Sequence, residues 1–150
     1  MQKSSYQGLI VWQKAMELTA VLYKLVKKLP KEELFSLSDQ MRRAVVSIPS
    51  NIAEGHDKHT KNEFIQFLTI ARGSKTELET QLLICVKVGY LIETEITEAL
   101  TLLTETGKML TSLINNLKRR QAKSRVELVR AMPRREGVLL RSEKSLKPEN

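Results

Sequence analysis

Residues 9–29 read LIVWQKAMELTAVLYKLVKKL, and the apolar side chains among them recur at alternating spacings of four and three residues. This spacing is typical of an α-helix that buries one apolar stripe. Pro30 follows directly and predicts the end of the helix, because the residue before a proline disfavours the α-helical backbone. The predicted stripe consists of Val11, Ala15, Leu18, Leu22, Leu25 and Leu29.

The segment 37–55 repeats the pattern and predicts a second helix. Ser36 or Ser38 is expected to cap its first turn, since a serine hydroxyl accepts a hydrogen bond from an exposed amide there. Pro49 stands inside this helix and is expected to bend it, because it removes one backbone hydrogen bond. Gly55 is expected to end it, because glycine tolerates a positive φ. The predicted buried positions are Leu37, Met41, Ala44, Val45, Ile48 and Ile52.

Two more helices are expected after the turn at His56–His59. Thr60 and Glu63 form a predicted capping box at the start of the third helix, and Gly73 in its middle predicts the close approach of a neighbouring helix. Gly89-Tyr90 predicts the next turn, after which Thr94 is expected to cap the fourth helix. The third helix should bury Phe64, Phe67, Leu68, Ala71, Leu78, Leu82 and Cys85, and the fourth Ile96, Leu100, Leu103, Gly107, Leu110, Ile114 and Leu117.

Four helices joined by short turns predict an all-α fold, an antiparallel up-down-up-down four-helix bundle over residues 1–120. The basic C-terminal extension, residues 121–150, is expected to stay helical at first, since Ala122, Val126 and Val129 continue the periodicity weakly. From Pro133 onward we expect a solvated tail.

The composition fits one globular domain, with 41% hydrophobic and 28% charged residues in 150. No apolar run approaches the roughly 20 residues that span a bilayer, so we expect no membrane partner. A single cysteine, Cys85, fits a reducing compartment, and the N-terminus has no apolar signal segment, so the expected location is the cytoplasm. The net charge of +8 favours polyanionic partners such as RNA, DNA or acidic protein surfaces.

The densest basic run begins at the predicted end of the fourth helix and could track the phosphate backbone of RNA or DNA. It has no interleaved aromatic residues, which favours backbone contacts over base stacking. The alternative is a solubilising tail without a fixed partner. The run consists of Lys118, Arg119, Arg120, Lys123, Arg125 and Arg130, and Arg134, Arg135 and Arg141 add to it.

The predicted helix 37–55 carries two further candidate residues for nucleic-acid binding, Arg42 and Arg43. They could hold phosphate oxygens or a partner carboxylate, or Arg43 could instead balance Glu54 or an acid of another helix. Arg72 and Lys75, one turn apart, are interpreted as a solvated charged face, because Glu77 and Glu79 follow immediately.

The same helix carries small or apolar residues away from its predicted core face, where a monomer would favour polar side chains. Such a second strip predicts an interface between copies of the chain, with ordinary surface residues as the alternative. The predicted interface residues are Val46, Pro49 and Ala53, with Ser47 and Ser50 on the far side of the helix.

No pattern in the sequence predicts catalysis, a cofactor or a metal. His56 and His59 lie in a turn with Asp57, and a metal site would need at least one further ligand nearby. The chain has no Gly-rich phosphate loop, no nucleophile elbow and no Glu-x-x-His pair of a di-iron bundle. Cys85 lies on the core face, where an inert thiol is expected.

Residues 42–55, RRAVVSIPSNIAEG, resemble the hallmark of the 23S rRNA intervening-sequence protein family, also called four helix bundle proteins. Further matches are FLTIARGS at 67–74, ELETQL at 77–82, GYL at 89–91 and LIVWQKA at 9–15, so that the resemblance covers roughly residues 8–118. The chain departs from the pattern at residues 56–59, where a glycine-rich turn is expected, and in the extension after residue 120.

This resemblance implies a four-helix bundle that assembles into a ring-like homopentamer. Members of the family occur inside inserts of bacterial large-subunit rRNA genes and as stand-alone genes. The family's structural relatives include accessory proteins of diversity-generating retroelements, which are basic pentamers that bind a reverse transcriptase and nucleic acid.

The predicted function is therefore a non-enzymatic, homo-oligomeric basic adaptor that binds the backbone of RNA or DNA, alone or together with a reverse transcriptase or another partner protein. The alternative is a scaffold that binds only proteins, in which the basic tail docks an acidic partner.

Overall fold

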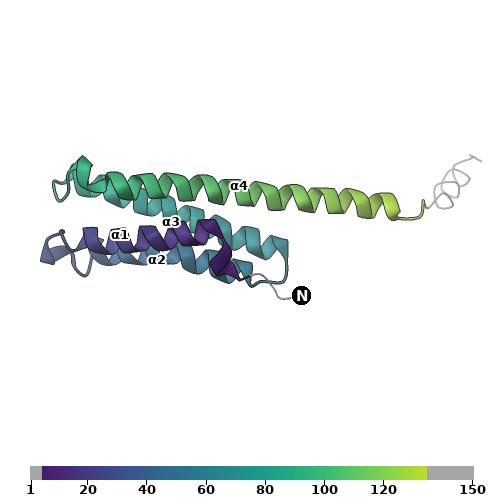
Figure 1. Ribbon diagram of the computed structural model, residues 1–150, viewed down its shortest axis with the longest axis horizontal. Helices are drawn as coiled ribbons and strands as arrows, with labels where there is room; N and C mark the ends of the chain where they lie inside the picture. Colours follow the sequence, from purple (N-terminus) through teal and green to yellow (C-terminus); the bar gives the residue numbers. More distant parts are fainter. Residues whose placement is uncertain (1–4, 135–150) are drawn as a thin grey trace, which may run out of the picture. The chain divides into compact units, whose positions relative to one another are not determined.

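A computed structural model describes residues 5–134, and these residues form helices and no strands. The four long helices are α1 (Ile10–Val26), α2 (Leu37–His56), α3 (Lys61–Lys87) and α4 (Glu93–Ala131), and short 3-10 helices precede α1 (η1, Tyr6–Gly8) and α2 (η2, Lys31–Glu33) (Figure 1). The chain divides into two compact units, Met1–Arg119 and the residues from Arg120 on, which are described separately. The first unit is the predicted four-helix bundle.

Contacts between neighbouring helices show that α2 is antiparallel to α3 and that α1 is antiparallel to α4. In α2 and α3, Ser47 meets Ser74 while Met41, nearer the start of α2, meets Cys85, nearer the end of α3. The same reversal joins α1 to α4: Lys14 lies 3.4 Å from Glu105, and Lys28, just after α1, lies 2.7 Å from Glu95. The hydrogen bond and charge of Glu105 raise the pKa of the Lys14 ammonium above its ordinary value.

The apolar stripes meet in one core, as the sequence periodicity predicts. All six predicted positions of the first stripe are buried, and so are most of the others. The exceptions, which are only partly buried, are Leu37, Phe64, Phe67, Leu100 and Gly107. None of the helices within residues 5–134 combines the length and apolar character that a bilayer crossing requires.

The start of α2 is capped by a carboxylate from the preceding 3-10 helix. Glu33 Oε2 accepts a hydrogen bond from the Leu37 amide at 3.2 Å and another from the Ser36 hydroxyl, and Glu33 Oε1 accepts one from the Tyr90 hydroxyl at 2.9 Å. The prediction that Ser36 or Ser38 caps α2 is wrong, since Ser36 makes no side-chain cap and Ser38 is buried in the first turn. The bond from Ser36, followed by those from Tyr90 and Leu37, lowers the pKa of the Glu33 carboxyl.

Two glycine predictions are also wrong. Gly55 does not end α2 with a positive φ, because the helix continues to His56 and Gly89 is the one described glycine with φ above zero. Gly55 instead permits a close contact with α3, where a Cβ at this position would lie 2.6 Å from Phe67 Cβ. Gly73 has no such neighbour, since a Cβ there would meet nothing within 4 Å.

The ends of α3 follow the sequence prediction closely. Thr60 and Glu63 form the predicted capping box, with both reciprocal hydrogen bonds present. At the other end, Gly89 has φ +84°, and the Gly89 and Tyr90 amides bond back to the carbonyls of Val86 and Cys85. This pair of bonds is a Schellman motif, which satisfies the last carbonyls of the helix.

The prediction for the start of α4 is wrong by a few residues. Thr94 lies inside the helix and does not cap it, since α4 begins at Glu93. The Ile92 amide is instead satisfied by Glu95 Oε1 at 3.1 Å. Like Glu33 at α2, a glutamate carboxylate takes the role that the sequence assigned to a hydroxyl.

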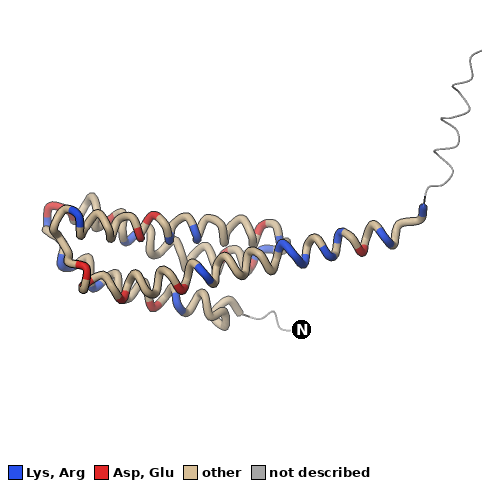
Figure 2. The backbone as a smooth tube through the Cα atoms, turned by 90° about the horizontal axis from the view of Figure 1, so that it is seen from above, with Lys and Arg blue, Asp and Glu red and all other residues tan. Residues whose placement is uncertain are grey.

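The described part of the second unit, residues 120–134, is helical through Ala131, as the weak periodicity predicts. Its side chains are exposed apart from Gln121, and Lys and Arg recur along this end of α4 in Figure 2. Of the predicted tail, residues 135–150 lie outside the described part of the chain, and with them Arg135 and Arg141.

Candidate nucleic-acid interface

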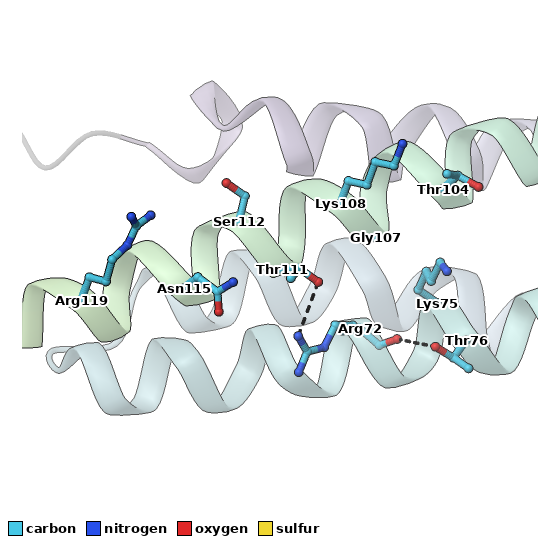
Figure 3. Close-up of a pocket in the computed structure, with 10 residues that line it drawn as sticks. All are labelled: Arg72, Lys75, Thr76, Thr104, Gly107, Lys108, Thr111, Ser112, Asn115 and Arg119. Atoms are coloured by element: carbon cyan, nitrogen blue, oxygen red, sulfur yellow. Dashed lines mark hydrogen bonds between the residues drawn. The ribbon is translucent and has the colours of Figure 1, made fainter. Parts of the chain in front are cut away.

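An open groove of about 640 Å³ runs between α3 and the bundle part of α4 (Figure 3). None of the residues that line it is acidic or aromatic. Its cations are Arg72, Lys75, Lys108 and Arg119, and between them lie the hydroxyl and amide groups of Thr76, Thr104, Thr111, Ser112 and Asn115. Such a surface matches a polyanion that is contacted through its phosphates.

Arg72 is positioned by both helices of the groove. Its Nη1 donates a hydrogen bond to Thr111 Oγ1 on α4 at 3.4 Å, and its backbone carbonyl accepts one from the Thr76 hydroxyl at 3.2 Å. The side chain is half-buried, which limits its movement. The guanidinium keeps its remaining N–H groups for a ligand, and such groups can form bidentate contacts with a phosphate.

Lys75 crosses the groove where α4 has a glycine. A Cβ at Gly107 would lie 2.9 Å from Lys75 Cε, so the missing side chain leaves room for the lysine stem against α4. The Lys75 ammonium pairs with Glu79 Oε2 at 2.7 Å, one turn further along α3. Glu79 thus offsets part of the positive charge at this end of the groove.

Lys108 and Arg119 carry the charge of the groove along α4. Neither forms an ion pair with any residue between 5 and 134, although Arg119 donates a hydrogen bond to Asn116 Oδ1. Figure 3 shows both side chains, with Ser112, pointing away from α3, so that the cations spread over the outer side of α4. The basic surface is therefore broad and open, as a long polymer needs.

The adjacent residues Arg42 and Arg43 lie in different surroundings. Arg43 extends into solvent and pairs with Asp39 Oδ2 at 2.9 Å, and not with Glu54. Arg42 is half-buried and donates a hydrogen bond to the Leu34 carbonyl at 3.1 Å. Neither arginine lines the groove between α3 and α4.

Of the predicted basic run, only Arg119 lines this groove. All six members of the run are exposed: Lys118, Arg119, Arg120, Lys123, Arg125 and Arg130. From Arg120 on they belong to the second unit, whose described part has Glu127 as its one acidic residue.

The residues of the predicted subunit interface lie in different surroundings. Val46 and Ser50 are exposed and Ala53 is partly buried, while Pro49 is buried within the chain itself. Ser47 is bonded to Ser74 of α3 at 2.8 Å, so it serves the contact between α2 and α3. Val46, Ser50 and Ala53 retain surface that a second copy of the chain could contact.

The sequence pattern does not predict the groove, because the lining residues come from two different helices. Arg72 and Lys75 were interpreted as a solvated face, whereas both are partly buried groove residues. Lys108 belongs to no basic run in the sequence. A signal was present in Thr104, Lys108, Thr111 and Asn115, which recur at spacings of four, three and four along one side of the apolar stripe of α4.

The other candidate groups show no arrangement of reactive side chains. Within the described residues, no three His, Cys, Asp or Glu side chains come together as metal ligands. His56 packs edge-on against the Phe64 ring at 5.9 Å. The Cys85 thiol is buried beside Met41, with Sγ and Sδ 3.7 Å apart, and burial, with a smaller effect of Glu33, raises its pKa.

Comparison with known proteins identifies one matching protein family. Residues 7–112 match the family model of the 23S rRNA-intervening sequence protein. The chain is also similar to a solved protein of unknown function from the S23 ribosomal protein family of Bacteroides thetaiotaomicron, with 28% identity and a TM-score of 0.66 over 70% of this chain and 98% of that one. No curated protein matches the sequence.

Proposed function

Because the chain belongs to the 23S rRNA-intervening sequence protein family, we propose that it is a non-enzymatic basic adaptor that binds the phosphate backbone of RNA or DNA. The observation that carries this proposal is the groove between α3 and α4, whose lining includes four cations and no acidic or aromatic residue. Lysine and arginine bind phosphates electrostatically, and hydroxyls and amides donate further hydrogen bonds to phosphate oxygens. The absence of aromatic rings from the lining favours contacts to the backbone over base stacking.

The exposed cations from Arg120 onward add to this function in a different way. Their side chains stand on a helix without the fixing contacts that hold Arg72 and Lys75. Such charges raise the local concentration of a polyanion and speed its association, but they define no register. In this proposal the groove holds the backbone, and Lys123, Arg125 and Arg130 attract it.

The proposal includes a homo-oligomer, a pentamer as the family resemblance implies, and an intracellular location in the cytoplasm. Val46, which is 41% exposed, with Ser50 and Ala53, supports a contact between copies through α2. An oligomer would repeat the groove several times, and linked weak sites bind a long polymer much more tightly than one site does. A reverse transcriptase or another protein is proposed as a further partner. Sedimentation equilibrium tests the homo-oligomer, and a monomer at all protein concentrations would contradict the proposed assembly.

Nucleic-acid binding is tested with a labelled structured RNA and a DNA duplex over a salt series. The groove variant is Arg72→Gln/Lys108→Gln, and the control is Lys24→Gln/Lys61→Gln, which removes the same charge from exposed sites away from the groove. The salt slope should fall by about two units in the groove variant and by less in the control. An equal fall of the salt slope in the two variants would mean that the groove cations contribute only through the overall positive charge of the protein.

The competing function is a scaffold that binds only acidic proteins. The excess of positive charge supports it as well, because it attracts any polyanion. No salt-sensitive binding of RNA or DNA by the intact protein, even at low salt, would favour this alternative.

A further inference from the structure

The connection between α1 and α2 forms a second, smaller cavity of about 240 Å³, far along the chain from the groove residues. Val26 and Leu29 are buried and give it an apolar floor, which Pro30 continues. Lys27, Lys31 and Arg42 contribute its charge, and no acidic residue lines it. The cavity therefore combines an apolar interior with a positive lining.

Arg42 is the cation that the structure holds in place. Its Nη2 donates to the Leu34 carbonyl at 3.1 Å, which leaves the other guanidinium N–H groups for a ligand. Its neighbour Arg43 makes a direct comparison possible: Arg43 has 80% of its side chain exposed, pairs with Asp39 and does not line the cavity. Two adjacent arginines with the same charge thus differ in access to the site.

Two acids near the cavity in sequence are engaged elsewhere, and Glu32, the neighbour of Lys31, is exposed and does not line the cavity. Glu33 accepts hydrogen bonds from Ser36, Leu37 and Tyr90, and Asp39 binds Arg43. The positive charge of the lining is therefore not matched by an acid of the lining, which is the complementarity that an anionic ligand needs. An arginine fork suits a planar carboxylate, to which it donates two parallel hydrogen bonds.

The size of the cavity limits the ligand. At about 240 Å³ it is smaller than the roughly 300–1,000 Å³ of usual small-molecule sites, so a whole nucleotide is too large for it. A single apolar side chain with an adjacent anionic group fits its dimensions and its chemistry. Tyr23 and Leu34, which are 42% and 46% exposed, offer further apolar surface where such a group would enter.

We propose that this cavity binds an apolar group that carries a carboxylate, as the C-terminal residue of a partner peptide does. The apolar side chain lies on Val26, Leu29 and Pro30, and the carboxylate accepts hydrogen bonds from Arg42 with support from Lys27 and Lys31. This site is independent of the phosphate-binding groove and does not rest on the function proposed for it.

The test is an amide NMR titration of the full chain with N-acetyl-L-leucine and, separately, with N-acetyl-L-leucinamide, which lacks the charge. The acid should cause saturable shifts at residues 23–42, and the neutral amide should bind about tenfold more weakly, because a hydrogen bond to a charged group is lost. Inorganic phosphate is titrated as a third probe. A short peptide ending in leucine, with a free or an amidated C-terminus, then separates a peptide terminus from a free small acid.

Arg42→Gln should weaken binding of the acid about tenfold, and the matched variant Arg43→Gln should leave it unchanged. If Arg42→Gln does not fold, the exposed pair Lys27→Gln/Lys31→Gln decides the question, since loss of affinity supports the site and unchanged affinity overturns it. Equal binding of acid and amide, equal losses in the Arg42 and Arg43 variants, or phosphate binding as tight as that of the acid would each overturn the proposal. A free-acid peptide that binds no better than its amide would also overturn it.

Discussion

The two stretches of α4 have similar sequence periodicity and very different surroundings. Between Glu93 and Arg119 the helix buries an apolar face in the bundle and turns Thr111 toward Arg72 of α3, while Lys108 lines the groove from its outer side. From Arg120 to Ala131 no described side chain is buried, and Val126 and Val129 are 50% and 62% exposed. Only the second stretch is basic in net charge, since the first carries Glu93, Glu95, Glu98 and Glu105 against three cations, but only the first lies beside the partly buried cations Arg72 and Lys75 of α3. Charge therefore marks a region that attracts polyanions, and contacts between helices decide where a defined site can form.

The largest expected contrast between the two stretches is in stability. Leu103 is fully buried, and Leu103→Ala should lower the free energy of unfolding by about 2–5 kcal/mol, because it leaves a cavity in the core. Val126→Ala and Val129→Ala should change it by no more than about 0.5 kcal/mol, as exposed substitutions do. Urea denaturation measures all three. A large loss for Val126→Ala would show that this stretch is packed in solution.

The next contrast is in nucleic-acid binding. Arg72→Gln/Lys108→Gln removes two groove cations and should reduce the salt slope by about two units. Lys123→Gln/Arg130→Gln removes the same charge from the exposed stretch and should reduce it by less than about one unit, because these side chains do not line the groove. Fluorescence anisotropy over a salt series measures both. A larger reduction of the salt slope in Lys123→Gln/Arg130→Gln than in Arg72→Gln/Lys108→Gln would place the main binding site on the exposed stretch.

A smaller effect is expected from Gly107→Ala. The new methyl group would lie 2.9 Å from Lys75 Cε, so the flexible lysine stem must move out of the groove. We expect affinity for RNA to fall a few-fold, while stability changes by no more than about 1 kcal/mol, since alanine favours the helix. Anisotropy and urea denaturation separate the two effects. Unchanged affinity would mean that the position of Lys75 does not matter for binding.

The smallest expected effect concerns the Glu33 cap of α2, which belongs to neither stretch of α4. Its pKa in the folded chain lies below the ordinary value of 4.5, so its contribution to stability is present above that pH and is lost as the pH falls through the folded pKa. Glu33→Gln should therefore be less stable than the parent near neutral pH, and the difference should shrink on acidification. Melting temperatures between pH 7 and pH 3 give the measurement. A difference that stays constant with pH would exclude the charge as its cause.

Features set by local sequence were predicted well, because they depend on neighbours a few residues away. The apolar stripe from Val11 to Leu29, the Thr60–Glu63 capping box and the turn at Gly89 all belong to this group. The resemblance of residues 42–55, together with the shorter matching segments between residues 9 and 91, likewise predicted the family, which the match to residues 7–112 confirms.

Features that depend on contacts between helices were not predictable in the same way. Gly55 has the sequence context of a helix end, but the nearby Phe67 of α3 gives it a different role. Serines at the start of α2 are good caps in isolation, yet Glu33 reaches the same amide and Tyr90 of a distant turn holds it there. The groove required α3 and α4 to be paired in a known register, which periodicity alone does not supply.

The central claim is that the groove between α3 and α4 holds a nucleic-acid backbone, and lysine footprinting tests it within one unaltered protein. Limited acetylation with and without saturating structured RNA, followed by mass spectrometry, compares Lys75 and Lys108 of the groove with Lys24 and Lys61 elsewhere on the bundle. We predict that the RNA protects Lys75 and Lys108 and leaves Lys24 and Lys61 as reactive as before. If the RNA is bound and Lys108 is acetylated at the same rate as in its absence, the backbone lies elsewhere and the proposed site is wrong.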